Sequence, residues 1–336
     1  MHRTLPITRF SAATARPRYL CALLCGLFLS LALTSPTKAA WPERPVTIVV
    51  PYAAGGAADV TVRIIAENVS SQIGQPVLIL NRPGSVTATT SVARAAPDGY
   101  TFMAAPMSHS MNVAMYKKLP YDTFGDFAPI ATFGYFNYVI VASKALGITK
   151  LSDVIAAMKA NPGKFNFGSG GVGSPTHLVV ELLKHQTQVE ATHVPYRADQ
   201  LGLTDLIAGR IQFMIPSTVA GGTYVKSGAV TALAVPSKER SKSLPDVPTT
   251  TEAGFPDFQV SSYYVLIAPK DTPSPILTQL NRAVNRALKD TTVVQRLADL
   301  GFSVQEDSTM DSTAALIRAE TDRWTPIIKS AGIALD

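Results

Sequence analysis

The chain of 336 residues contains only two cysteines, Cys21 and Cys25, and both lie in an N-terminal segment with the pattern of an export signal. Residues 1–39 combine basic residues, a central apolar run and small residues at the end, and cleavage is expected after Ala39. Without this segment the chain has no disulfide, no thiol nucleophile and no cysteine metal ligand. The sequence therefore predicts a protein exported to the periplasm.

Excess charge and long apolar runs are also missing after the predicted signal. The formal charge of the chain is +6, but five cations lie in the signal, which leaves about +1 for the remainder. No basic cluster with interleaved aromatic residues is present, so nucleic acid is not an expected partner. No later stretch approaches the roughly 20 apolar residues of a membrane span. The mature chain is expected to be a soluble monomer.

Motifs for nucleophilic catalysis and metal binding are absent as well. There is no G-x-S-x-G elbow and no S-x-x-K motif with plausible partners. His177, His185 and His193 are spaced eight residues apart, not in an H-E-x-x-H or H-x-H arrangement. We therefore predict no catalytic residue, no metal site and no cofactor. A pair of acid-base carboxylates stays open, because such pairs lie on unrelated segments.

Short apolar strands alternate with helical patterns along most of the remaining chain. Such alternation predicts parallel β-sheets covered by helices, and therefore an α/β fold. Strands are expected at 46–50, 77–80, 100–104, 165–167, 191–195, 211–215 and 230–235. Helices are expected over 60–69, 85–96, 107–116, 176–184 and 199–208, from Ser152 on, and on the apolar stripes of 276–288 and 316–328.

Two longer β-rich runs, residues 128–143 and 260–268, interrupt this alternation. Each is long enough to cross from one domain to another, so two hinge strands are expected. We therefore predict a discontinuous first domain of residues 40–140 and 245–336, and a second domain of residues 141–244 inserted into it.

The turn of residues 51–59 (PYAAGGAAD) lies between a strand pattern and a helix pattern. A strand that leads into a helix through glycines directs free backbone N–H groups and the positive end of the helix dipole at one place. The turn has no Lys and no G-x-x-x-x-G-K-[ST] order, so it is not a typical nucleotide-binding loop. A smaller anion, such as a carboxylate, is the better hypothesis.

A second glycine-rich loop, residues 168–173, formally matches G-x-G-x-x-G between a strand and a helix. A dinucleotide fold also needs an acidic residue at the end of the next strand, where residues 194–196 read VPY. We therefore interpret the loop as a second anion cradle that faces the first. The hydroxyls of Ser174 and Thr176 either only cap the following helix or also donate to a ligand.

Further short motifs occur along the chain after the predicted signal. In order they are Trp41-Pro42 with Pro45, Gly55-Gly56-x-x-Asp59, Gly74-Gln75-Pro76, Asn81-Arg82-Pro83-Gly84, Ala96-Pro97-Asp98-Gly99-Tyr100, Leu119-Pro120-Tyr121-Asp122, Ser174-x-Thr176-His177, His193-Val194-Pro195-Tyr196, Leu244-Pro245-Asp246-Val247-Pro248-Thr249 and Glu252-Ala253-Gly254. With this series the chain resembles the substrate-binding proteins of tripartite tricarboxylate transporters, also called the Bug family.

The resemblance implies a type II periplasmic binding protein, whose two domains close like a flytrap on an organic acid and present it to permease subunits. It implies no catalysis. Loops of both domains would hold the ligand carboxylate, together with a loop after the strand of 100–104. Carried over to this sequence, the candidate ligand residues are Tyr52, Ala53, Ala54, Gly55, Gly56, Asp59, Ser108, His109, Gly170, Ser174, Thr176 and His177.

The chain departs from the family's pattern after the strand of 211–215. The family often has an Asp-Asn pair there, whereas this chain has Pro216 and Ser217, followed by Thr218, and we keep Ser217 and Thr218 as candidate ligand residues. Because a carboxylate for a ligand amine is missing, an amino-acid ligand is not expected. Six aromatic or thioether residues are expected near the cleft: Tyr52, Met107, Tyr135, Phe136, Tyr263 and Tyr264. They either favour an aromatic carboxylate as the ligand or pack at the hinge.

The main hypothesis is a periplasmic receptor for a mono- or dicarboxylate that works with membrane permease subunits. Two alternatives stay open, a carboxylate sensor that signals to a membrane kinase and a secreted hydrolase. Neighbouring genes for a large and a small permease subunit would favour transport, and turnover of the ligand would favour the hydrolase.

Overall fold

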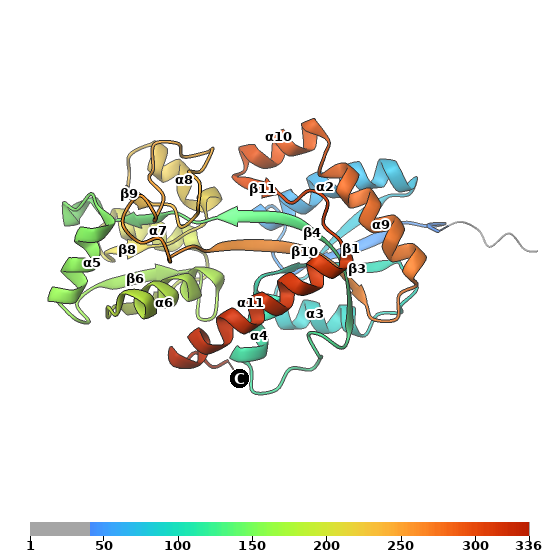
Figure 1. Cartoon of the computed structure of the whole chain (residues 1–336), viewed down its shortest axis with the longest axis horizontal. Helices are drawn as coiled ribbons and strands as arrows, with labels where there is room; N and C mark the ends of the chain where they lie inside the picture. Colours follow the sequence, from blue (N-terminus) through green and yellow to red (C-terminus); the bar gives the residue numbers. More distant parts are fainter. Residues whose placement is uncertain (1–40, 336) are drawn as a thin grey trace, which may run out of the picture. The chain divides into compact units, whose positions relative to one another are not determined.

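The computed structural model describes residues 41–335, so the predicted export signal lies outside the described residues. From Arg44 onward the chain forms one unit that contains two β-sheets (Figure 1). Within residues 41–335, none of the helices combines the length and apolar character that crossing a bilayer requires.

The first sheet has six strands in the order β11-β4-β10-β3-β1-β2. They are β1 (Val46–Val50), β2 (Val77–Asn81), β3 (Thr101–Pro106), β4 (Phe127–Asn137), β10 (Ser261–Pro269) and β11 (Phe302–Val304). β1 is parallel to β2 and β3, whereas β10 is antiparallel to both β3 and β4. Apolar side chains on β1, β3 and β10 are almost completely buried, which makes this sheet the centre of the core.

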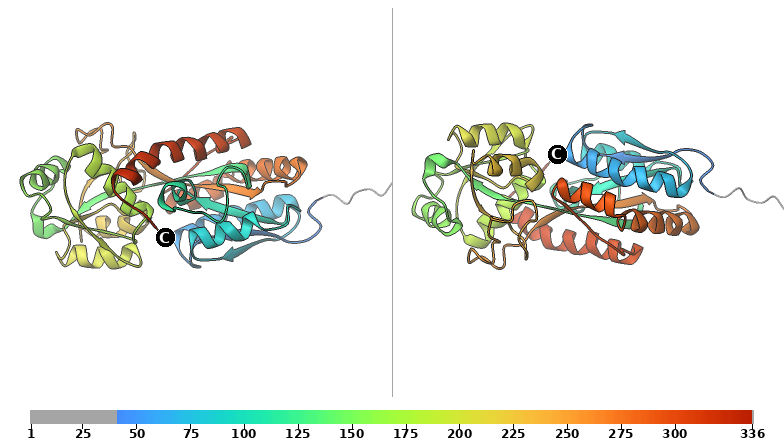
Figure 2. Two further views of the ribbon diagram at one scale, coloured as in Figure 1. Left: turned by 90° about the horizontal axis from the view of Figure 1, so that it is seen from below. Right: turned by 90° about the horizontal axis from the view of Figure 1, so that it is seen from above.

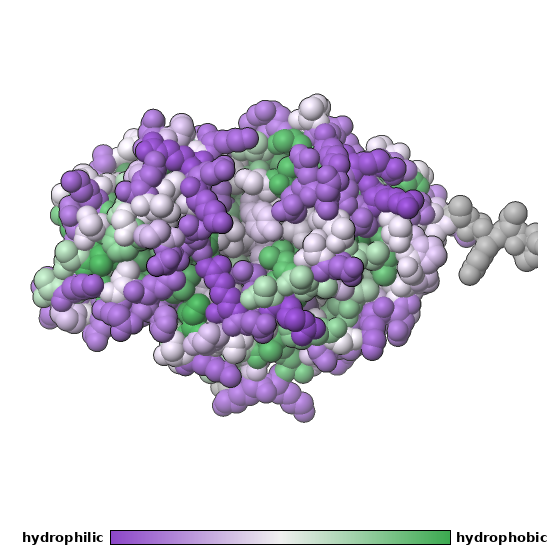
Figure 3. Space-filling view, viewed as in Figure 1, coloured by the Kyte–Doolittle hydropathy of each residue, from purple (hydrophilic) through white to green (hydrophobic). Residues whose placement is uncertain are grey.

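Helices cover the first sheet, as the two views in Figure 2 show. They are α2 (Ala57–Ile73), α3 (Ser85–Ala93), α4 (Ser108–Met115), α9 (Ser274–Ala287), α10 (Thr291–Asp299) and α11 (Met310–Ser330). α2 packs against α9 and α10, whereas α11 packs on α4 and β4. The apolar stripe of α11 buries Trp324 and Ile328 completely. On the face seen in Figure 3 the surface is mostly hydrophilic, with apolar residues in small patches.

The second sheet has five shorter strands in the order β7-β6-β8-β5-β9. They are β5 (Ile140–Ala142), β6 (Asn166–Ser169), β7 (Thr192–Pro195), β8 (Phe213–Met214) and β9 (Thr231–Ala234). Its helices are α5 (Leu151–Ala160), α6 (Pro175–Thr187), α7 (Asp199–Ile207) and α8 (Thr218–Lys226), and a 3-10 turn spans Lys144–Leu146.

The sequence pattern predicted parallel sheets, whereas both sheets combine parallel and antiparallel pairs. The chain leaves the first sheet along β4 and returns to it along β10. Because β4 and β10 are neighbours in the sheet, the outgoing and the returning strand run in opposite directions. The β-rich run of 128–143 is also not one strand, because it divides into β4 and β5, which belong to different sheets. The domain boundaries at residues 140/141 and 244/245 stay a prediction.

Three short elements were not anticipated from the sequence. α8 contains Gly221 and Gly222, which lower intrinsic helix propensity, and α10 has only nine residues. β11 has three residues and forms by pairing with β4, a contact that no local sequence pattern specifies.

Candidate functional site

A cavity of about 380 Å³ lies between elements of the two sheets. From the first sheet and its helices it is lined by Tyr52, Ala53, Gly56, Ala58, Phe136, Tyr138, Ser262 and Tyr264. From the second it is lined by Gly170, Ser174, Pro175, Thr176, Arg197, Ala198, Asp199, Gln200, Ser217 and Ala220. We call this cavity the cleft.

The N-termini of four helices meet at the cleft. α2 begins after Gly56, α6 after Ser174, α7 after Ala198 and α8 after Ser217, and all four N-cap residues have extended backbone and line the cleft. The N–H groups of the first helical turn have no acceptor within the helix, and the helix dipole places partial positive charge at this end. The cleft therefore favours an anion, and its donors are mainly backbone groups.

The first loop, residues 51–56, is held by a buried carboxylate. Asp59 is 2% exposed and accepts hydrogen bonds from the Gly55 N–H at 2.9 Å, from Arg63 Nε at 2.9 Å and from Asn81 Nδ2 at 2.9 Å. Asn81 Nδ2 also donates to the Tyr52 carbonyl at 3.2 Å. This network ties the loop to α2 and to the end of β2.

The charge of Asp59 is stabilised by these partners. Burial alone would raise the pKa of the carboxyl group, but the hydrogen bonds from Arg63, Gly55 and Asn81 outweigh burial and lower the pKa to about 2. Asp59 and Gly55 therefore brace the loop and do not line the cleft, whereas Tyr52, Ala53 and Gly56 do. Ala54 is exposed beside them and is outside the lining.

The second loop, residues 170–174, is held mainly by uncharged side chains, with the Asp199 carboxylate as a further partner. Thr176 Oγ1 accepts a hydrogen bond from the Gly170 N–H at 2.9 Å and donates to Asp199 Oδ1 at 3.0 Å. Ser174 Oγ accepts from the His177 N–H at 3.2 Å, which is an N-cap bond. Gly170, Ser174 and Thr176 all line the cleft. Capping and cleft lining therefore coexist here.

His177 lies behind this loop and does not line the cleft. Its Nδ1 accepts a hydrogen bond from the Gly173 N–H at 3.1 Å, and its ring stacks on His193 with centroids 3.8 Å apart. Burial, together with the charge of Lys184 and the His193 ring, lowers the pKa of His177 to about 3. The imidazole is therefore neutral at pH 7 and positions the loop.

Aromatic side chains form one wall of the cleft. Tyr52 and Phe136 both pack edge-on against Tyr264, with ring centroids 6.4 and 5.2 Å apart, and Tyr138 lies beside them in the lining. Burial raises the pKa of Tyr52 to about 12, against the hydrogen bonds with Ser108 and Tyr264. The phenol groups therefore stay protonated and offer hydroxyl donors next to an apolar surface.

Ser108 supports this wall from behind. Its hydroxyl lies 3.2 Å from Ser85 Oγ and contacts Tyr52, so it holds the tyrosine without lining the cleft. Of the other aromatic residues expected near the cleft, Tyr263 points to the opposite side of β10, where its hydroxyl lies 2.5 Å from Ser110 Oγ. Tyr135 and Met107 are also outside the lining. Strand alternation, which separates Tyr263 from Tyr264, accounts for this division.

The two candidates near α8 also differ from each other. Ser217 lines the cleft and caps α8, with Oγ accepting from the Ala220 N–H at 3.2 Å. Thr218 is 4% exposed and donates to the Asn137 carbonyl at 3.2 Å, which ties α8 to the end of β4. His109 does not line the cleft, because its ring lines a separate, smaller cavity.

Asp199 was not predicted as a site residue, although it is a carboxylate in the cleft wall. Burial raises its pKa, against hydrogen bonds from Thr176 and the Gly170 backbone. Residues 216–218 led to the expectation that the cleft lacks a carboxylate for a ligand amine. That expectation overlooked Asp199 on α7. Arg197, Gln200 and Tyr138 were also missed. The acid at the start of a predicted helix was the only local signal.

No group of three or more His, Cys, Asp or Glu side chains that would hold a metal ion occurs within residues 41–335. The lining of the cleft combines N–H and O–H donors, which favour an anion, with an aromatic wall on one side and Asp199 and Arg197 on the other.

The chain is similar to known proteins over most of its length. Residues 61–333 match a family profile described as the tripartite tricarboxylate transporter family receptor. Protein BugT of Bordetella pertussis is 33% identical over 316 residues, which cover 92% of this chain and 97% of BugT. A solved structure of an R. palustris protein with adipate is 34% identical, with a TM-score of 0.79, and the match covers 88% of this chain and 99% of that one. MatC from Rhodopseudomonas palustris with bound malate is 34% identical, with a TM-score of 0.76 and coverage of 86% and 100%.

Proposed function

Because this chain belongs to the receptor family of tripartite tricarboxylate transporters, we propose that it is a periplasmic solute-binding protein that captures an organic carboxylate and delivers it to membrane subunits of such a transporter. The resemblance drawn from the sequence motifs is confirmed, and so is the fold class, an α/β two-domain binding protein. The delivery step and the identity of the acid are the proposal.

The convergence of four helix N-termini on one cleft is the observation that supports carboxylate binding most strongly. Adipate and malate, which accompany two related structures, are both carboxylic acids. A hydrogen bond to a charged acceptor contributes about 1.5–3 kcal/mol, and a micromolar site needs about 8 kcal/mol net. A few donors from each loop are therefore sufficient.

The two loops are attached to different sheets, and this arrangement makes ligand binding and domain closure one event. Gly56 and its neighbours belong to the first sheet, whereas Ser174 and Thr176 belong to the second. A carboxylate that accepts hydrogen bonds from both loops binds the closed arrangement more tightly than an open one, so it shifts the population toward closure. The ligand is bound and released unchanged, without chemistry.

The remaining lining residues narrow the class of ligand. The wall of Tyr52, Phe136 and Tyr264 gives the body of the ligand an apolar surface, which suits an aliphatic or aromatic acid. Asp199 faces the same space, so it favours a ligand with a hydroxyl or ammonium donor and opposes a second carboxylate nearby. We therefore propose a mono- or dicarboxylate, with hydroxy acids favoured over unsubstituted dicarboxylates of the same length.

Thermal unfolding with a panel of ligands tests binding. The panel holds adipate, malate, aromatic acids and amino acids, each paired with its amide, which lacks the carboxylate charge, as a control. A ligand at 100 times its Kd adds about 2.7 kcal/mol to the free energy of unfolding, which shifts the Tm visibly. The acids should stabilise the protein and the amides should not. Stabilisation by sugars or nucleotides alone would contradict the proposal.

Two further measurements separate a receptor from the alternatives. Recovery of unchanged ligand after long incubation, followed by NMR, is expected for a receptor, and conversion of the ligand would indicate a hydrolase. Uptake of the labelled acid should be lost in cells that lack this gene and return with the wild-type gene. Intact uptake in the deletion strain would favour a sensor role.

A further inference from the structure

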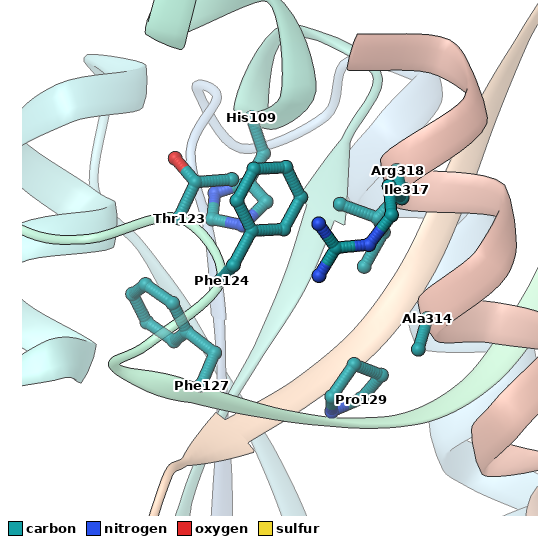
Figure 4. Close-up of a pocket in the computed structure, with 8 residues that line it drawn as sticks. All are labelled: His109, Thr123, Phe124, Phe127, Pro129, Ala314, Ile317 and Arg318. Atoms are coloured by element: carbon teal, nitrogen blue, oxygen red, sulfur yellow. The ribbon is translucent and has the colours of Figure 1, made fainter. Parts of the chain in front are cut away.

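A second cavity of about 80 Å³ lies between α4, α11 and the segment that leads into β4 (Figure 4). His109 projects into it from α4, Arg318 from α11, and Thr123 and Phe124 from the connecting segment. None of these residues lines the cleft. The cavity is much larger than the roughly 10–15 Å³ needed to hold one water and far smaller than the cleft, so it suits a ligand of a few atoms.

Three buried polar atoms on two residues that line this cavity have no hydrogen-bond partner among the described residues. They are both ring nitrogens of His109, which is 1% exposed, and the hydroxyl of Thr123, which is 5% exposed. A buried polar group without a partner destabilises the folded state, and such groups are rare in folded proteins. Three of them at one cavity indicate that a ligand completes the site.

Arg318 supplies the charge at this cavity. Its guanidinium lies over the Phe124 ring, 4.5 Å from the centroid, and Figure 4 shows it directed toward the side where His109 lies. Among residues 41–335 no ion pair to Arg318 is present, and no carboxylate lines the cavity. The side chains that face the cavity thus offer N–H and O–H donors and one positive charge, which is the environment of an anion.

The state of His109 fits this description. Burial lowers its pKa to about 4, against a smaller opposing effect of the Thr123 backbone. The ring packs face to face with Tyr121 and edge-on with Phe127, so its orientation is fixed. A neutral imidazole has one N–H donor, and an anion in the cavity gives that donor an acceptor.

We propose that this cavity is a second binding site, separate from the cleft, for a small monovalent anion of the size of chloride, bromide or formate. The Arg318 guanidinium provides the charge, and the His109 N–H and the Thr123 hydroxyl provide further donors. The anion links α4, α11 and the segment before β4, so its binding stabilises the folded protein. The site is independent of the proposed function, because no cleft residue takes part.

Diffraction from crystals grown in sodium bromide tests the site directly. The expected result is an anomalous peak in this cavity, within hydrogen-bond distance of His109 and close to Arg318. Two results would overturn the proposal. One is water alone in the cavity at a bromide concentration that saturates the increase in Tm, and the other is bromide in the cleft only.

Thermal unfolding provides the second test, with bromide exchanged for gluconate at constant ionic strength. Gluconate is too large for the cavity. The Tm of the wild type should rise and saturate with bromide, and Arg318→Met and Thr123→Val should each raise the half-saturating concentration at least tenfold. Lys329→Met, which removes an exposed cation from the same helix, is the matched control and should respond as the wild type does. An equal response of Arg318→Met and wild type would also refute the site.

Discussion

The two loops that meet at the cleft have the same backbone design but different supports. Gly55 and Gly173 both have positive φ, +79° and +72°, and each stands one residue before an N-cap. In each loop the third residue of the following helix accepts a hydrogen bond from that glycine N–H, four residues back. Asp59 does so in the first loop and His177 in the second.

The difference between the loops is the charge of this acceptor. Asp59 is an ionised carboxylate paired with Arg63, whereas His177 is a neutral imidazole stacked between aromatic rings. Both residues were predicted to contact the ligand. Neither lines the cleft, and each accepts a hydrogen bond from the glycine that shapes its loop. A residue within a binding motif can therefore stabilise the loop that carries the motif.

The largest effect is expected from a carboxylate placed in the first loop itself. Gly56 has φ −75°, and a Cβ there would meet only the Ala53 carbonyl oxygen, at 3.5 Å. Gly56→Asp should therefore fold, with a good N-cap, while its carboxylate occupies the place of the ligand's. We expect at least a 100-fold loss of affinity for carboxylates by calorimetry, without loss of Tm.

Gly56→Ala is the control for this change, because it adds volume without charge. It should reduce affinity by less than tenfold. Wild-type affinity in a folded Gly56→Asp variant would remove the first loop from the site.

Of the two loop supports, the charged Asp59 should contribute more to the free energy of unfolding. Asp59→Ala removes a buried carboxylate whose pKa is lowered from 3.8 to about 2, which corresponds to about 2–3 kcal/mol of folding free energy at pH 7. Because the pKa is depressed in the folded state, this contribution is complete above about pH 4 and is lost as the pH falls toward 2. Urea unfolding of wild type and variant should therefore converge at low pH.

Asp98→Ala, at the exposed pair with Arg44, is the control and should cost less than about 0.5–1 kcal/mol. If Asp59→Ala costs no more than this control at pH 7, the carboxylate does not hold the loop.

The uncharged support of the second loop should contribute less to the free energy of unfolding. Thr176→Val removes the acceptor of the Gly170 N–H and the donor to Asp199, and we expect a loss of about 1–2 kcal/mol in stability and roughly tenfold in affinity. Thr204→Val, on the exposed side of α7, is the matched control and should leave affinity unchanged. Equal affinities of Thr176→Val and wild type would mean that the second loop takes no part in binding.

The smallest effect concerns Asp199, whose pKa is raised by burial. A second ligand carboxylate raises this pKa further, so wild-type affinity for a dicarboxylate should increase a few-fold as the pH is lowered from 7.5, within the range where the ligand keeps both charges. His177 and His193, with pKa values lowered to about 3 and 4, stay neutral in this range. Asp199→Asn should bind the dicarboxylate a few-fold more tightly at pH 7.5 and lose the pH dependence. A pH dependence that persists in Asp199→Asn would assign it to another group.

Local patterns in the sequence were sufficient for most of the strand, loop and helix units and for the family. The period of apolar residues, the glycine turns and the N-cap at Ser174 depend on neighbours a few residues apart, so they can be read from the chain alone. The same patterns located both loops of the cleft, including Gly56 and Thr176, without any knowledge of their partners.

Only the tertiary structure decided which side chain faces which space. Asp59 and His177 turn toward their own loops, Tyr263 and Tyr264 separate onto opposite sides of β10, and His109 faces a cavity that its neighbour Ser108 does not line. Asp199 enters the cleft because Thr176, 23 residues earlier, holds it there. These outcomes depend on packing between segments far apart in the chain, and no local pattern encodes such contacts.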